Sequence, residues 1–150
     1  MKQYIICGLD DEHYMYPDIK VVDTYNEQKE IELVEKERDL AVRSISPDRE
    51  YIIYGDDKTF YVQSWFQVDT DDAYAVVYHH AYEGVDFRLE TTGTYRHCRD
   101  FISQDMMNVW LRIPEEDRVE FTDQHNWHVI DDNYQWHVWN IVPLKGLVTK

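Results

Sequence analysis

The sequence predicts an α+β fold: a mainly antiparallel sheet of six or seven strands, arranged as hairpins and a meander, with two helices packed on it. Several short apolar runs of period two follow one another between turn clusters, which is typical of strands paired in hairpins. Two longer segments, 24–45 and 94–113, instead space their apolar residues at helical intervals. A chain of 150 residues fits a single globular domain, 1–150.

The first third of the chain predicts two strands and then a helix. Residues 3–8 are an apolar run, and 18–23 form a second β-rich stretch. Thr24 followed by Glu27 fits a capping box, which starts a helix, and Pro47 requires that the helix end before it. The predicted apolar stripe of this helix comprises Ile31, Leu33, Val34, Leu40, Ala41 and Ile45.

The middle of the chain alternates between strands and turns. We expect strands near 51–54, 60–68, 74–82 and 85–89, because these segments are rich in β-branched and aromatic residues. Thr94 then fits the N-cap of a second helix, and a short strand follows at 119–121.

Two similar C-terminal segments, 126–129 and 135–138, predict a hairpin. A turn centred on residues 132 and 133 pairs residue 130 with residue 135. This register places His128 across from His137 on one face of the sheet, because side chains alternate along a strand. The other face is then a core surface formed by Trp127, Val129, Trp136 and Val138. We find no long sequence repeat.

Charge is the strongest functional signal. The chain has 30 Asp and Glu against 15 Lys and Arg, a formal net charge of −15. Aromatic residues make up 15% of it, so this excess acid belongs to a folded domain rather than a disordered tail. An anionic surface repels nucleic acid and anionic lipid and attracts basic protein surfaces. We therefore expect no direct contact with nucleic acid or membrane.

The acids occupy predicted turns and the outer face of the first helix. Asp favours turns and Glu favours exposed helix faces, which explains their positions but not the shortage of compensating Lys and Arg. Self-repulsion costs stability, so either solubility or binding of a basic groove offsets it. The expected partner-binding residues are the acids plus two Trp anchors: Asp10, Asp11, Glu12, Glu30, Glu32, Glu35, Glu37, Asp39, Asp56, Asp57, Asp71, Asp72, Trp65 and Trp139.

In composition alone, the chain is similar to the small acidic proteins that phages and mobile elements use against restriction or CRISPR nucleases. That similarity implies a non-enzymatic inhibitor, a DNA mimic that blocks the basic nucleic-acid-binding site of a host defence or DNA-processing protein in the host cytoplasm. The sequence leaves the partner's identity and the oligomeric state open.

The alternative is a small metal-dependent phosphohydrolase or nucleotide-processing enzyme. Asp10 and Asp11 follow a predicted strand, as Mg²⁺ ligands do in phosphoryl chemistry. Further ligands would come from His79, His80, His128 and His137. However, the chain has no His-Glu-x-x-His, Cys-x-x-Cys, phosphate-loop or Gly-x-Ser-x-Gly motif, so we expect no cofactor, metal or catalytic residue.

The two cysteines and the apolar runs indicate a compartment. Cys7 and Cys98 lie far apart without a secretion signal, which favours reduced thiols. No apolar run reaches the roughly 20 residues of a membrane span. We expect a cytoplasmic protein.

Overall fold

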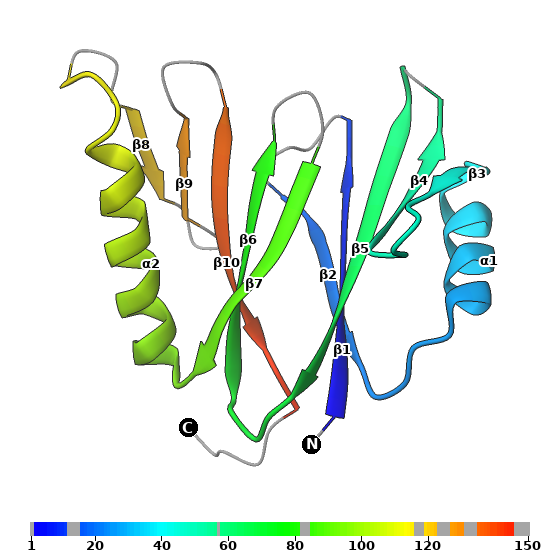
Figure 1. The fold of residues 1–150 in the computed structure, drawn as a ribbon, viewed down its shortest axis with the longest axis horizontal. Coiled ribbons are helices and arrows are strands. Elements are labelled where there is room, and N and C mark those ends of the chain that lie inside the picture. The colour runs from blue at the N-terminus through cyan, green and yellow to red at the C-terminus, as the bar shows by residue number, and fades with distance from the viewer. Residues whose placement is uncertain are drawn as a thin grey trace. The chain divides into compact units, whose positions relative to one another are not determined.

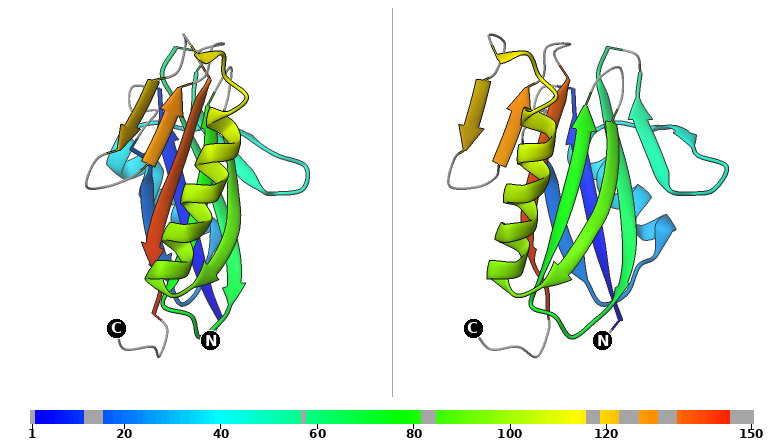
Figure 2. Two further views of the ribbon diagram at one scale, coloured as in Figure 1. Left: turned by 90° about the vertical axis from the view of Figure 1, so that its left-hand side faces the viewer. Right: turned by 60° about the vertical axis from the view of Figure 1, so that its left-hand side comes forward.

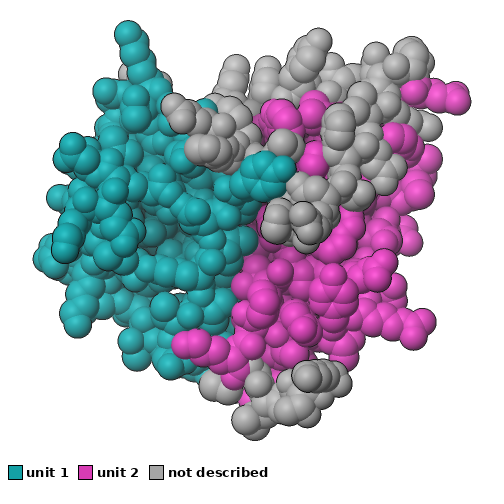
Figure 3. Space-filling model, turned by 180° about the vertical axis from the view of Figure 1, so that it is seen from behind, with its two compact units in different colours: residues 1–69 teal, residues 70–150 magenta. Residues whose placement is uncertain are grey.

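The computed structural model describes residues 2–11, 16–56, 58–81, 85–115, 119–122, 127–130 and 135–145. It divides into two compact units, unit 1 (residues 1–69) and unit 2 (residues 70–150), which are coloured separately in Figure 3. The predicted α+β class with two helices is confirmed. The predicted single sheet of six or seven strands is only roughly matched, because the described strands form two five-stranded antiparallel sheets.

Unit 1 is one sheet with one helix on its face (Figure 1). The strands lie in the order β2-β1-β5-β4-β3, so α1 connects the two edge strands. Its elements are β1 (Lys2–Asp10), β2 (Asp18–Val22), α1 (Glu27–Arg38), β3 (Val42–Ile45), β4 (Tyr51–Gly55) and β5 (Phe60–Asp69).

Unit 2 has the same plan, and α2 crosses one face of its sheet (Figure 2). The strand order is β7-β6-β10-β9-β8, and α2 again connects the edge strands. Its elements are β6 (Tyr74–Ala81), β7 (Val85–Gly93), α2 (Tyr95–Trp110), β8 (Val119–Thr122), β9 (Trp127–Ile130) and β10 (Trp136–Pro143).

The two units therefore share one connectivity, ββαβββ, in which the first strand pairs with the second and with the last. The sequence has no long repeat that would predict this duplication. It becomes visible only when the strand pairing of each unit is compared.

Helix α1 is shorter than predicted at both ends. It is capped by Asn26, whose side chain accepts a hydrogen bond from the Lys29 backbone N–H at 3.1 Å, so the predicted capping box at Thr24 is wrong. It ends where Asp39 takes the left-handed conformation, at φ 55°. Residues 42–45, which were expected in the helix, pair with β4 instead, because strand pairing overrides their helical spacing.

Helix α2 begins where the sequence predicts. Thr94 accepts a hydrogen bond from the His97 backbone N–H at 3.1 Å, which confirms the predicted N-cap. The helix buries four residues against the sheet: Cys98, Ile102, Met106 and Val109. Val76, Val129 and Trp139 of the sheet complete this core.

The C-terminal hairpin is one residue out of its predicted register. Trp136 pairs with Ile130, and Trp139 pairs with Trp127. A shift of one residue moves every side chain to the opposite face. The predicted core face is therefore wrong, and so is the pairing of His128 with His137. Trp139 and Val129 instead share the face that packs under α2.

Candidate functional site

Both units carry the same twofold excess of acid. Unit 1 has 16 Asp and Glu against 8 Lys and Arg, and unit 2 has 14 against 7. The ratio of acidic to basic residues is therefore the same in both units. The units differ in the positions of their carboxylates.

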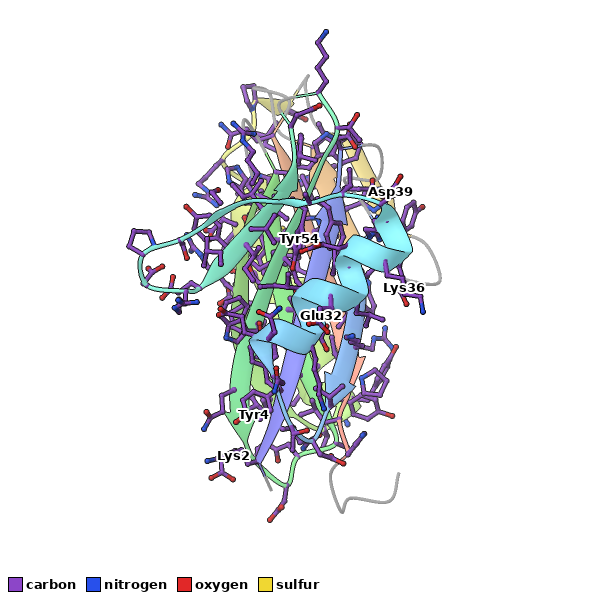
Figure 4. The ribbon with its side chains drawn as sticks, turned by 90° about the vertical axis from the view of Figure 1, so that its right-hand side faces the viewer. Lys2, Tyr4, Glu32, Lys36, Asp39 and Tyr54 are labelled. Atoms are coloured by element: carbon purple, nitrogen blue, oxygen red, sulfur yellow. The ribbon has the colours of Figure 1, made fainter. Side chains whose placement is uncertain are left out.

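The outward face of α1 carries an acidic stripe, defined as Glu32, Glu35 and Asp39. Glu32, Lys36 and Asp39 are labelled in Figure 4. The residues of the stripe are three and seven positions apart, so they lie on one side of the helix. All three are exposed. They extend over about 10 Å of helix axis at 1.5 Å per residue. Lys36 flanks them and is the predicted favourable partner of Glu32 on this surface.

Two other acids of α1, Glu27 and Glu30, face the sheet and are paired, whereas Glu37 is exposed without an ion-pair partner among the described residues. Glu30 was expected on the outer face, but its side chain is only 14% exposed and its Oε2 lies 2.9 Å from Lys20 Nζ of β2. Glu27 forms an ion pair with Arg49. The helical period explains the difference, because both residues fall on the same side of α1 as the buried Val34.

Asp10 is also held within unit 1. Its Oδ2 lies 3.3 Å from a guanidinium nitrogen of Arg38, which is also paired with Asp18. The same guanidinium lies over the Tyr61 ring, 3.9 Å from its centroid. Two carboxylates and an aromatic face therefore fix the position of Arg38 at the end of α1.

Four predicted acids lie at or just after the ends of β1, α1 and β4: Asp10, Asp11, Asp39 and Asp56. The Asp11 backbone N–H donates to the Phe60 carbonyl, and the Gly55 N–H donates to the Ala41 carbonyl, so the ends of α1, β1 and β4 come together. Hydrogen bonds from the backbone N–H groups of Thr59 and Lys58 lower the pKa of Asp56. Arg43 also lies near Asp56. Glu12 and Asp57 lie outside the described residues.

The two predicted Trp anchors are not exposed, so that expectation is wrong. Trp139 is fully buried under α2, and its Nε1 donates to Asp105 Oδ2 at 2.9 Å. Trp65 is partly buried and stacks on Tyr25 with ring centroids 5.0 Å apart. Both faces were misassigned because each Trp faces the helix of its own unit.

Two predicted acids, Asp71 and Asp72, lie at the start of unit 2. Asp71 is exposed, whereas Asp72 accepts a hydrogen bond from the Thr92 hydroxyl at 2.7 Å. Asp72 thus connects the start of β6 to the end of β7.

The sequence did not reveal a pocket between α1 and strands β1, β2 and β5. Its volume is about 350 Å³. Glu30, Glu37 and Arg38 line it from the helix, and Gln63 and Tyr61 line it from β5. It was missed because only the pairing of β1 with both β2 and β5 brings these residues together.

The histidines of unit 2 form a different cluster from the one predicted. His80 pairs directly with His137, and their ring centroids are 5.0 Å apart. The Tyr78 hydroxyl lies 2.8 Å from His137 Nδ1, and His80 Nε2 lies 2.5 Å from Gln135 Oε1. Burial raises the pKa of Tyr78 to about 12, so its hydroxyl is protonated at neutral pH. His79 and His128 are buried elsewhere in the unit.

The pocket and the histidine cluster occupy equivalent positions in the two units. Ile6 lies between Lys20 and Trp65, as Tyr78 lies between Arg88 and Trp139. Two residues further along the same strands, the equivalent positions again match. Gly8 lies between Asp18 and Gln63, and His80 lies between Asp86 and His137. Both units therefore have an Asp, a Lys or Arg and a Trp at equivalent positions, which we call the shared framework. The other residues of these two rows differ between the units.

The enzyme alternative finds no ligand set in the part of the chain that is described. There, no three His, Cys, Asp or Glu side chains are grouped so as to hold a metal ion. Asp10 is engaged by Arg38. Both cysteines are free and buried, and burial raises the pKa of Cys98 to about 11, which disfavours the reactive thiolate.

Neither described helix has the length and apolar character that crossing a membrane requires. The comparisons give no relatives: no family model, no curated protein and no solved structure matches this chain.

Proposed function

We propose that this protein is a non-enzymatic inhibitor that docks through the acidic stripe of α1 on a basic, nucleic-acid-binding surface of another protein. One observation carries the proposal. Glu30 and Glu27 of α1 are paired with Lys20 and Arg49, whereas Glu32, Glu35 and Asp39 are exposed together on its outward face.

The spacing of the stripe suits a surface that grips DNA. Three carboxylates over about 10 Å resemble the charge density of one DNA strand, which carries a phosphate every 3.4 Å or so along the axis. The stripe ends at Asp39, two residues before Ala41, whose carbonyl accepts a hydrogen bond from the Gly55 N–H next to Asp56. A groove lined with Lys and Arg would meet these carboxylates where it normally meets phosphates.

The position of Asp39 favours binding over solubility. A non-glycine residue in the left-handed region is strained, and an acid at a helix C-terminus opposes the helix dipole. A solvated coat would not need a carboxylate at this point. Residues that break local rules are expected at functional positions.

The narrower form of the proposal is DNA mimicry of the anti-CRISPR or anti-restriction type, with a phage- or mobile-element-encoded protein acting in the host cytoplasm. It is supported by a net charge of −15 on folded, aromatic-rich units. The partner would then be a nuclease or another DNA-processing enzyme with a basic channel.

The test compares two triple variants of equal net charge. Glu32→Gln/Glu35→Gln/Asp39→Asn removes the stripe. Gln104→Lys/Met107→Lys/Leu111→Lys adds the same three units of charge at the same spacing on exposed positions of α2. Binding is measured against a panel of purified RNA-guided nucleases and restriction–modification enzymes, with duplex DNA as competitor, at about 50 and 200 mM salt.

The stripe variant should bind at least about tenfold more weakly, since each exposed ion pair contributes up to about 1 kcal/mol. The α2 variant should bind like the wild type, and rising salt should weaken both. Equal losses in the two variants would mean that net charge, not a shaped surface, drives association. The proposal also fails if no member of the panel binds at the lower salt concentration.

A further inference from the structure

We infer that the pocket beneath α1 receives one cationic side chain, an arginine or a lysine, of the basic partner. The identity of the donor as a protein rests on the proposed function. The chemistry of the pocket rests on its own residues, which all belong to unit 1.

The pocket has the size and walls for a side chain with an aliphatic stem. Its volume of about 350 Å³ lies at the lower end of the usual range for ligand pockets. Ile6, Ile19, Leu33 and Val34 form apolar walls. Leu33 is exposed at the rim, where an entering stem would cover it.

The inner part of the pocket has a buried acceptor that lacks a donor, the side-chain oxygen of Gln63. Gln63 is only 3% exposed, and its Oε1 has no hydrogen-bond partner among the described residues. A buried acceptor without a donor costs about 1–3 kcal/mol. The Glu30 carboxylate also lines the pocket and is paired there with Lys20. A guanidinium or ammonium group supplies several donors at once.

The rim supplies the charge. Glu37 is exposed at the pocket edge and has no ion-pair partner within the described part of the chain. The pocket's own cations, Lys20 and Arg38, are already paired with carboxylates. With three carboxylates against two cations, the lining favours a further positive charge and repels an anion.

The equivalent place in unit 2 has different residues. Where unit 2 has His80 and His137 in ring contact, unit 1 has Gly8 and Gln63. A Cβ on Gly8 would lie 1.6 Å from Tyr61 Oη, so only glycine lets the Tyr61 ring lie across this strand. At this position unit 2 therefore holds two histidine rings in contact, whereas unit 1 holds the Tyr61 ring over Gly8 beside the Gln63 amide.

The experiment titrates blocked amino acids into ¹⁵N-labelled protein. N-acetyl-arginine methylamide should bind with a dissociation constant on the order of 1 mM and shift the amides of Glu30, Leu33 and Gln63. N-acetyl-norleucine methylamide, which has the stem without the charge, should not bind. Free arginine and spermidine test whether a small cation, rather than a protein side chain, is the better ligand.

Two variants and one control locate the effect. Glu37→Gln removes the rim charge, and Gln63→Leu removes the buried acceptor; each should weaken blocked-arginine binding at least about fivefold. Glu50→Gln changes an exposed acid of unit 1 away from the pocket and should leave binding unchanged. The amide spectrum of each variant reports whether it is folded.

The outcomes separate this inference from the docking proposal. If blocked arginine shifts no pocket residue, or if norleucine binds equally well, the inference fails even where the α1 stripe still binds a basic protein. If blocked arginine binds while no basic protein does, the docking proposal fails and the pocket stands as a site for small cations. Preferential binding of spermidine would overturn the assignment to a protein side chain.

Discussion

The two helices occupy the same place in the same fold, but they are held by different forces. Helix α2 buries four residues, whereas α1 buries one, Val34. Helix α1 is instead tied down by charged contacts from Glu27, Glu30 and Arg38. A helix attached mainly by charges contributes little core, but it leaves a large polar surface available to a partner. The comparison indicates that α2 contributes more apolar core to its unit than α1 does.

Large-to-small substitutions in the two helices should give the largest effects. Ile102→Ala in α2 removes a side chain that is 1% exposed and should cost about 3 kcal/mol of unfolding free energy. Val34→Ala in α1 deletes fewer atoms and should cost about half as much. Urea unfolding followed by circular dichroism measures both. Equal losses would remove the contrast between the helices.

The polar contact under α2 should come next. Asp105→Ala leaves the buried indole N–H of Trp139 without its acceptor and should cost about 1–3 kcal/mol. Asp105→Asn keeps an oxygen acceptor and should cost clearly less. The same unfolding experiment distinguishes them, and similar losses in both variants would show that the carboxylate charge, not the hydrogen bond, matters.

Local sequence signals predicted much of this structure. The strand at 60–68, the Thr94 cap and the α+β class follow from period, composition and capping chemistry. The errors concern long-range pairing. The one-residue shift of β10 and the contact of His80 with His137 depend on which strands meet, which no local pattern records. The exposed stripe of α1 was predictable from helical spacing, but the pocket below it was not, because three strands build it.

A smaller effect of opposite sign is expected at the end of α1. Asp39→Gly relieves the left-handed strain and removes an acid from the negative end of the helix dipole. It should therefore raise the unfolding free energy by about 0.5–1 kcal/mol. If the stripe is a docking surface, the same variant should bind its partner more weakly. A variant that is both more stable and an equally good binder would leave Asp39 without a functional role.

The smallest effect is expected for Glu90 in unit 2, where the surroundings disfavour the charged carboxylate. Burial and the nearby Asp105 raise the pKa of Glu90. A carboxyl whose folded-state pKa is raised favours folding when protonated, and that advantage is lost as pH rises through the folded-state pKa. Glu90→Gln should thus gain thermal stability relative to the wild type between about pH 4 and pH 7, by a few tenths of a kcal/mol. Melting temperatures measured across this range test the sign. A parallel pH profile for the two proteins would mean that Glu90 is fully solvated. In that case the acids of unit 2 would resemble those of the α1 stripe.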